Sequence, residues 1–208
     1  MKFEKISYDQ YMKDCADKFD FTYEDIKLPK RGTMKSAGYD FFSPVGFTLL
    51  PGQVIKLPTG IKFDCDDDKF LGCYPRSGHG FKYGIMLTNT VGIIDADYYN
   101  NPGNEGHIWV KITYPKTKIN TEPFVVNKGD AIFQGIIQPY YTVEDDTTTK
   151  ERVGGFGSTS TGESNNSTLS HRFTKEDTEF AIKAAMAELQ KMMDADSGNT
   201  SGKRILHG

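Results

Sequence analysis

The sequence predicts a mostly β fold of the barrel or double-sheet jelly-roll type, with a helical C-terminal extension. The middle of the chain contains many short apolar segments separated by turn residues, a spacing typical of such folds. In the segment HIWVKITY (107–114), Ile108, Val110 and Ile112 alternate with less buried types, as in a half-buried strand. Twenty-one glycines and only one long helical segment agree with this class.

The expected strands are the apolar segments between turn signals such as Pro51-Gly52 and Asn127 to Asp130. They are 47–50, 54–57, 60–63, 107–114, 124–126 and 131–138. Ahead of them, residues 7–19 predict a short polar helix with Ser7 as its N-cap. Near the end, Thr174 begins about twenty helix-forming residues with one apolar stripe.

These features divide the chain into four parts. We expect an N-terminal helical segment at 1–25, a β core at 26–146, a polar and glycine-rich mobile arm at 147–162, and a C-terminal extension with one helix at 163–208. The arm should be loosely held because its composition buries little apolar surface.

Composition excludes several classes of function. The net charge of −3 and the scattered lysines and arginines argue against direct nucleic-acid binding. The sequence contains no apolar run long enough to predict a membrane segment. The three cysteines are odd in number and match no zinc-ligand spacing, so we expect reduced thiols in a cytoplasmic protein.

Two segments predict chemistry in the core. PRSGHG (75–80) joins an arginine, a hydroxyl and a glycine, which suits a phosphate but also an ordinary surface turn. In NTVGIIDADYY (89–99), Asp95 is a candidate general base and Tyr98 a flat surface for a sugar or a base. A capped turn with an exposed tyrosine is the alternative reading.

Three further segments add weaker signals. In RVGGFGST (152–159), consecutive glycines allow backbone N–H groups to converge on an anion, and Phe156 is too apolar for a mere linker. Asp40 in SAGYDFF either holds a turn or directs water toward a metal. Gln134 in KGDAIFQ is a candidate hydrogen-bond donor to a phosphate.

In this order, AGYD, PRSG, GIIDADYY, GDAIFQ and GGFGST resemble the five motifs of the trimeric dUTPases, from about Ile26 to Thr159. The resemblance implies a β jelly roll that forms a homotrimer and cleaves dUTP to dUMP and pyrophosphate. It also implies active sites shared between chains: one supplies the region of Asp40, Arg76 and Gln134, a second supplies the Asp95 hairpin, and a third supplies the arm with Phe156.

The resemblance also implies residue roles. Asp95 would activate water for attack on the α-phosphorus, and Mg²⁺ would be held by the phosphates, with Asp40 touching its water shell. The nucleoside would be held by Asn89, Gly92, Ile94, Tyr98 and Phe156. The triphosphate would be held by Arg76, Ser77, Gly78, Gln134, Arg152, Gly157 and Ser158.

The sequence departs from the family pattern in four places. His79 stands where a small or aliphatic residue is common, and we expect it to face solvent in a loop. The hairpin after Tyr98 is longer than the compact family form. Arg152 lies four residues before Phe156, one fewer than in many members, and the chain continues well beyond Thr159.

Two alternatives stay open at this point. A dCTP deaminase shares the fold and a PRS-like loop, but it needs a carboxylate where alignment places Lys111. A dUTPase fold with an added protein-interaction role is the other, since the C-terminal stripe is rich in methionine. Packing of that helix on its own trimer is the preferred interpretation.

Overall fold

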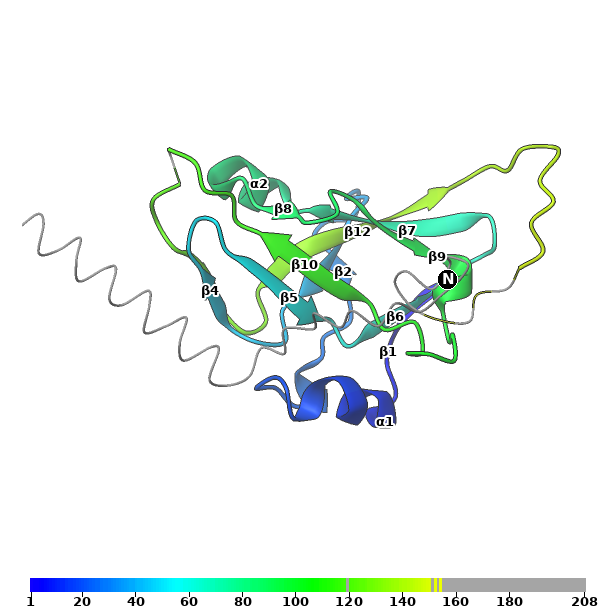
Figure 1. Ribbon diagram of the computed structural model, residues 1–208, viewed down its shortest axis with the longest axis horizontal. Coiled ribbons are helices and arrows are strands. Elements are labelled where there is room, and N and C mark those ends of the chain that lie inside the picture. The colour runs from blue at the N-terminus through cyan, green and yellow to red at the C-terminus, as the bar shows by residue number, and fades with distance from the viewer. Residues whose placement is uncertain (119, 151, 153, 155–208) are drawn as a thin grey trace, which may run out of the picture. The chain divides into compact units, whose positions relative to one another are not determined.

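The computed structural model describes residues 1–118, 120–150, 152 and 154 (Figure 1). The predicted C-terminal helix and the site residues Phe156, Gly157 and Ser158 lie outside the described residues. Strands dominate the described part, which confirms a mostly β fold with a short N-terminal helix. No helix in this part is both long and apolar enough to cross a bilayer.

A five-stranded antiparallel sheet carries the motifs. Its order is β2 (Lys30–Arg31), β3 (Tyr39–Phe42), β12 (Ala131–Pro139), β7 (Lys69–Pro75) and β9 (Gly92–Asp95). The long strand β12 is central because it pairs with β3 on one side and with β7 on the other. The strand β9 forms one edge of this sheet (Figure 1).

Three smaller antiparallel sheets complete the β structure. One has the order β5 (Val54–Pro58), β10 (Trp109–Thr113) and β8 (Met86–Leu87); the others pair β11 (Phe124–Val126) with β4 (Phe47–Leu49) and β1 (Lys2–Lys5) with β6 (Ile61–Asp64). Each of the six expected segments contains a strand, and Ile108, Val110 and Ile112 are buried as their alternation predicts.

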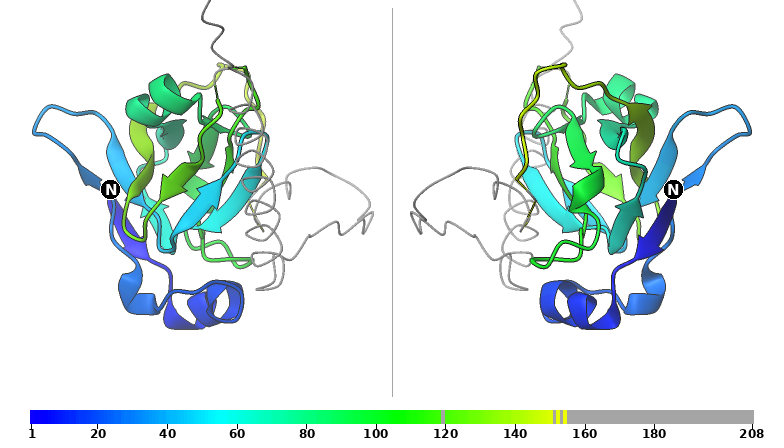
Figure 2. Two further views of the ribbon diagram at one scale, coloured as in Figure 1. Left: turned by 90° about the vertical axis from the view of Figure 1, so that its left-hand side faces the viewer. Right: turned by 90° about the vertical axis from the view of Figure 1, so that its right-hand side faces the viewer.

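Aromatic and branched side chains form the buried core. Figure 2 shows the strands arranged around this interior. Phe41 of β3 and Phe133 of β12 stack with ring centroids 4.4 Å apart, and both are fully buried. Burial of one such ring stabilises the fold by roughly 2–3 kcal/mol. The strands β3 and β12, which carry motif residues, are therefore anchored on the face that packs against the core.

The N-terminal segment packs on this core. Helix α1 (Tyr8–Tyr11) begins at Ser7, whose side chain accepts from the Gln10 N–H at 3.0 Å, so the predicted N-cap is confirmed. It continues as the π-helical turn η1 (Met12–Ala16), and the 3₁₀ turn η2 (Tyr23–Asp25) follows. The helix is not wholly polar, because Tyr11 and Cys15 are buried. Strand β1 was not expected from the sequence.

The PRSGHG segment corrects an expectation. We expected a loop, but residues Ser77–Tyr83 form helix α2, with Arg76 at its N-cap. Gly84 ends it in the left-handed conformation at φ 65°, where a side chain is disfavoured. Two glycines inside the helix lower its intrinsic propensity, which explains why the sequence does not predict it.

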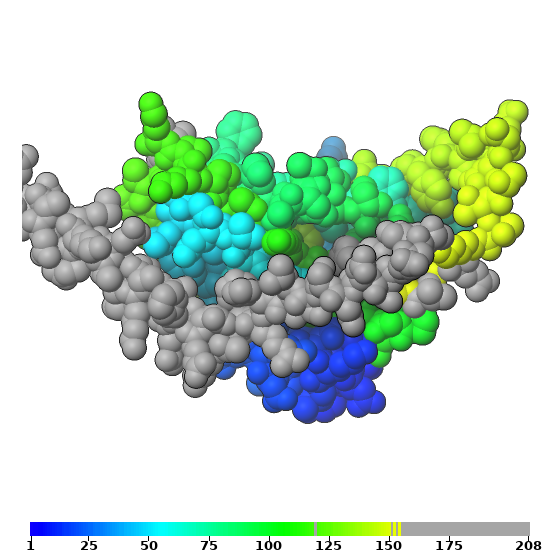
Figure 3. Space-filling model, in the orientation of Figure 1, coloured from blue at the N-terminus to red at the C-terminus, as the bar shows by residue number. Residues whose placement is uncertain are grey.

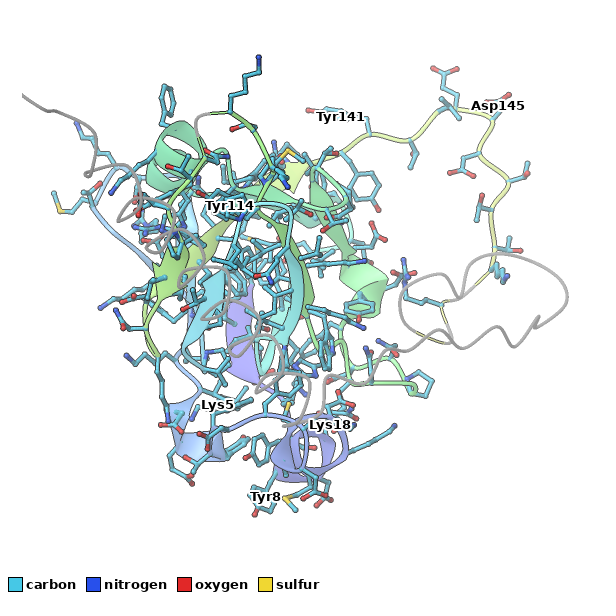
Figure 4. All side chains as sticks on the ribbon, turned by 60° about the vertical axis from the view of Figure 1, so that its left-hand side comes forward. Lys5, Tyr8, Lys18, Tyr114, Tyr141 and Asp145 are labelled. Carbon is cyan, nitrogen blue, oxygen red and sulfur yellow. The ribbon has the colours of Figure 1, made fainter. Side chains whose placement is uncertain are left out.

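After β12 the described chain leaves the sheet without further helices or strands as far as residue 150. Tyr141 and Asp145 lie on this extended stretch, and the Tyr141 side chain is 93% exposed (Figure 4).

Candidate functional site

One end of the five-stranded sheet gathers the residues expected to bind phosphate. The register places Asp40 beside Gln134 and Gln134 beside Tyr74, one residue before the end of β7. Arg76 follows directly, and its Nε donates to Asp40 Oδ1 at 3.0 Å. Its Nη1 also donates to the Ala131 carbonyl at 3.3 Å. The guanidinium is thus oriented while keeping nitrogens for a ligand.

Gln134 and the start of α2 complete this end. Gln134 Nε2 donates to the Pro75 carbonyl at 3.0 Å. A Cβ on Gly38 would lie 2.2 Å from Gln134 Oε1, so only glycine allows this packing. Ser77 and Gly78 follow Arg76 in the first turn of α2, and a Cβ on Gly78 would meet nothing within 4 Å. The backbone here is therefore open to close approach.

His79 does not face solvent as expected. The side chain is half-buried, and its ring meets the Phe124 ring edge-on at 5.0 Å. Burial, and then the nearby Arg76 charge, lower the pKa of His79. The imidazole is therefore neutral near pH 7, so the positive charge beside Asp40 comes from Arg76.

The opposite end of the sheet gathers the residues expected to hold the nucleoside. Asp95 ends β9, and the turn η3 (Ala96–Tyr98) follows it at once. Arg152 bridges two carboxylates here: its Nη2 lies 2.6 Å from Asp95 Oδ2 and its Nε 2.7 Å from Asp97 Oδ1. The role of Asp97 was missed, although its place in DADY, two residues after Asp95, was the available signal.

Tyr98 is held firmly in this turn. The side chain is only 4% exposed, and its hydroxyl donates to the His107 carbonyl at 3.0 Å while accepting from Asn104 Nδ2 at 2.8 Å. Burial raises the pKa of Tyr98, so the phenol stays neutral. The Arg152 guanidinium lies over the ring, 5.7 Å from its centroid.

Gly92, Ile94 and Asn89 lie on or beside β9. Gly92 and Ile94 belong to β9, and Ile94 is buried. Asn89 Nδ2 lies 3.6 Å from the position that a Cβ on Gly92 would take. The structure therefore brings Ile94, Asp95, Tyr98 and Arg152 together at one end of β9, whereas Gly92 and Asn89 lie at the other end, beside Cys73.

Asp95 faces two hollows. An open cleft of about 500 Å³ is lined by Asp67, Phe70, Ile93, Asp95, Ala96, Asp97, Tyr140 and Arg152. A smaller pocket of about 30 Å³ lies between Ile93, Ile94, Asp95, Tyr98 and Arg152. The smaller pocket is too small for a nucleoside while Arg152 covers the tyrosine ring.

The two ends do not meet within one chain. Asp95 pairs with Phe70 at the start of β7, whereas Asp40 lies three strands across and level with Tyr74. Strand spacing and residue rise separate the Asp40 and Asp95 backbones by roughly 20 Å. Within one chain, Arg76 and Asp95 therefore lie at opposite ends of the sheet.

Known proteins give an independent comparison. The sequence model of the dUTPase family matches residues 24–162. The deoxyuridine 5'-triphosphate nucleotidohydrolase of Lactococcus lactis subsp. lactis is 40% identical over 136 residues, which cover 64% of this chain and 88% of that protein. Its counterpart in Desulfitobacterium hafniense is 36% identical over 142 residues, covering 64% and 87% respectively.

Solved structures agree. The crystal structure of the dUTPase from Streptococcus mutans is 33% identical, with a TM-score of 0.54, and the match covers 69% of this chain and 99% of that one. The Staphylococcus bacteriophage 80alpha dUTPase, solved with dUpNHpp, has a TM-score of 0.51 at 19% identity over 72% of this chain and 88% of that one, a likeness of fold alone.

The deaminase alternative lacks its acid/base carboxylate. Lys111, which aligns with the required position, is an exposed lysine on β10. The order of the five motifs and the family match both point the same way. The chain belongs to the dUTPase family, and it hydrolyses dUTP to dUMP and pyrophosphate.

Proposed function

We propose that Asp95 is the general base of this reaction. The observation that carries this assignment is its position between both hollows, next to Tyr98, at the end of a rigid strand. A carboxylate so placed can orient a water molecule and accept its proton as the water attacks the α-phosphorus in line. Arg152 bonds this carboxylate, and we propose that it moves to the phosphates when dUTP binds.

The phosphate end has a matching role. Arg76 and Gln134 bind the triphosphate oxygens, and the Ser77 and Gly78 backbone lies close against them. The ion pair with Asp40 supports this role because it fixes the guanidinium plane before substrate arrives. In the arm, Gly157 and Ser158 bind phosphate and Phe156 stacks on the uracil; these three assignments rest on the motif match alone.

The Asp40 carboxylate fits a magnesium ion held mainly by substrate. Oδ1 receives the Arg76 hydrogen bond, and the side chain is 24% exposed, so the carboxylate can accept from metal-bound water. Magnesium in nucleotide sites keeps several waters and takes one or two carboxylates besides the phosphates. Bound Mg²⁺ would neutralise charge that develops on the departing pyrophosphate.

Specificity for uracil follows from the edge position of β9. The outer N–H and C=O groups of an edge strand are free of the sheet and can meet the acceptor–donor–acceptor edge of uracil. Cytosine would leave buried groups unpaired, at roughly 1–3 kcal/mol each. The thymine methyl would overpack the hairpin, and the Tyr98 ring would block a ribose 2′-hydroxyl.

A test of this reading compares the deoxynucleoside triphosphates and UTP. Pyrophosphate release is expected with dUTP and Mg²⁺, and at most weakly with dCTP, dTTP or UTP. We propose that this activity limits uracil incorporation into DNA and supplies dUMP for dTMP synthesis. Ammonia release from dCTP would instead favour the deaminase.

We further propose a homotrimer of jelly-roll cores in the cytoplasm, with shared active sites. The roughly 20 Å between the Asp40 and Asp95 backbones supports sharing, since each half of the site then needs its complement from another chain. The domain boundaries near residues 25, 146 and 162, and a protein partner for the C-terminal helix, stay predictions. A chain that ends at Thr159 can be compared for trimer mass, activity and co-purifying proteins.

Mixing inactive chains tests the sharing directly. Arg76→Ala and Asp95→Asn each leave one half of the site intact, so co-expressed chains are expected to regain about one quarter of normal activity, because each of two contributing chains has an even chance of being the suitable one. Separately purified variants and doubly substituted chains serve as controls. Activity that stays absent in the mixture would show that each site lies within one chain.

A milder change tests the orientation of Arg76. Arg76→Lys is expected to lower kcat/KM for dUTP by about 10-fold, because an ammonium group cannot bond Asp40 and a phosphate with the same planar fork. The matched control is Arg31→Lys on β2, an exposed arginine whose Nη1 donates to the Met34 and Ser36 carbonyls and whose guanidinium lies over the Tyr39 ring. Equal kinetics for both variants would contradict the role of the ion pair.

A further inference from the structure

The N-terminal segment lies mostly outside the family match at 24–162, yet it contacts the lengthened hairpin loop at residues 99–107. Ser7 donates to Glu105 through its N–H at 3.0 Å and its hydroxyl at 2.5 Å. Lys13 Nζ donates to the Gly103 carbonyl at 3.2 Å. The two segments lie side by side in Figures 1 and 3. A segment mostly outside the family match is therefore joined to the lengthened hairpin loop.

The strongest of these contacts is buried. His107 is fully inaccessible, and its Nδ1 lies 2.6 Å from Asp14 Oδ2 in η1. The other ring nitrogen, Nε2, accepts from the Gly60 N–H at 3.0 Å. An acceptor at Nε2 requires the proton of a neutral ring on Nδ1, so His107 donates to Asp14. The tautomer and the plane of the ring are thereby fixed.

Asp14 is itself supported in this contact. Burial alone would raise the pKa of Asp14, but the hydrogen bonds from His107 and Gln10 outweigh it and leave the pKa below its ordinary value. Gln10 Nε2 donates to the same oxygen at 2.8 Å. Asp14 is therefore a charged acceptor near neutral pH, which makes the bond to His107 a strong one.

The main chain of His107 carries this restraint to the nucleoside end. Its carbonyl accepts from the Tyr98 hydroxyl, and Asn104 of the same loop donates to that hydroxyl. The aromatic ring that we assign to the deoxyribose is thus anchored at its far end by a loop that the N-terminal segment holds in place. Hydrogen bonds of this kind restrict the orientation of a binding side chain more than the packing of that side chain alone.

We propose that Asp14 and His107 are positioning residues for Tyr98, through which the N-terminal segment sets discrimination against a ribose 2′-hydroxyl. This inference rests on the proposed role of Tyr98. When the support is removed, the ring can tilt and admit UTP. The chemical step at Asp95 does not involve this contact.

The test compares kcat/KM for dUTP with kcat/KM for UTP. Asp14→Ala is expected to lower the dUTP:UTP ratio by about 10-fold, mainly through KM, with kcat for dUTP changed less than about 3-fold. Asp14→Asn keeps an acceptor for Nδ1 and is expected to retain most of the ratio. Asp17→Ala, which removes an exposed carboxylate three residues further along the same segment, is the matched control and should leave the dUTP:UTP ratio unchanged.

Fluorescence gives a second readout. Trp109 is the only tryptophan of the chain, and its ring lies 5.2 Å from the His107 ring, centroid to centroid. Asp14→Ala is expected to shift its emission, and Asp14→Asn to leave it nearly unchanged. If Asp14→Ala melts below the assay temperature, Glu105→Ala replaces it and should lower the ratio by about 3-fold, because it removes the Ser7 contact at a more exposed position.

Tyr98→Leu separates the two possible failures. A ratio that stays unchanged in folded Tyr98→Leu would overturn the proposed role of the tyrosine. If Tyr98→Leu lowers the ratio but folded Asp14→Ala does not, the positioning role alone is wrong. Where Glu105→Ala replaces Asp14→Ala, an unchanged dUTP:UTP ratio in Glu105→Ala would likewise mean that the positioning role alone is wrong.

Discussion

Asp95→Asn is expected to lower kcat for dUTP by about 10²–10⁴-fold while leaving dUTP affinity nearly unchanged. The amide keeps the size of the side chain but cannot take a proton from water. In the proposed site, substrate binding depends on other groups: we assign the nucleoside to Tyr98 and the β9 backbone, and phosphate to Arg76. The measurement is pyrophosphate release for kcat, together with calorimetric titration of dUTP into the variant.

Asp97→Asn is the matched control for this prediction. Asp97 lies two residues away in the same turn and shares Arg152 with Asp95, at 2.7 Å from its Nε. The control therefore also loses a carboxylate from the Arg152 bridge, without touching the proposed base. It should keep kcat within about 3-fold. Comparable losses in both variants would mean that the Arg152 bridge, rather than proton transfer, explains the effect.

Gly106→Ala is expected to destabilise the protein by about 3 kcal/mol or more. Gly106 has φ 79°, and a Cβ there would lie 2.5 Å from the Tyr98 carbonyl oxygen and 3.0 Å from Tyr99 Cα. Neither backbone atom can move cheaply, because the Tyr98 carbonyl accepts from Asn101 Nδ2 at 2.8 Å. The measurement is thermal unfolding of the Gly106→Ala variant and of the unsubstituted protein at the same protein concentration.

Gly84→Ala is the control for backbone strain without a clash. Gly84 has φ 65°, and the nearest atom to its Cβ would be Asn120 Nδ2 at 3.8 Å. Strain alone should cost about 1–2 kcal/mol. A Gly106→Ala chain no less stable than Gly84→Ala would contradict the close approach of the two backbones.

Local patterns predicted the strands well and the helices less well. The alternation of buried and less buried residue types in β10 was sufficient to predict this strand, because one face of the strand is buried and the other is not. Strand β1 was missed because Lys2–Lys5 carry three charges, and only pairing with β6 makes them a strand. Helix α2 was missed because Gly78 and Gly80 hide it, although Gly84 beyond its end was a usable signal.

Local sequence patterns are also insufficient for the candidate site. Motif resemblance nominates Asp40, Arg76 and Asp95, which stay predictions, but their hydrogen-bond partners within the chain were not predictable. Arg76 bonds a carboxylate 36 residues away, Arg152 one 57 residues away, and His107 one 93 residues away. Such distances in sequence carry no periodic signal, since they are set by the order of strands in the sheet.

The distance between the two ends of the five-stranded sheet has a kinetic consequence. If neither end works alone, a correctly folded single chain is catalytically silent, and turnover per chain becomes a function of protein concentration. Assays diluted below the dissociation constant of the assembly would then show a lag on reconcentration, with a reaction order in protein above one. Substitutions on exposed surfaces far from any substrate could abolish turnover without altering the fold of the individual chain.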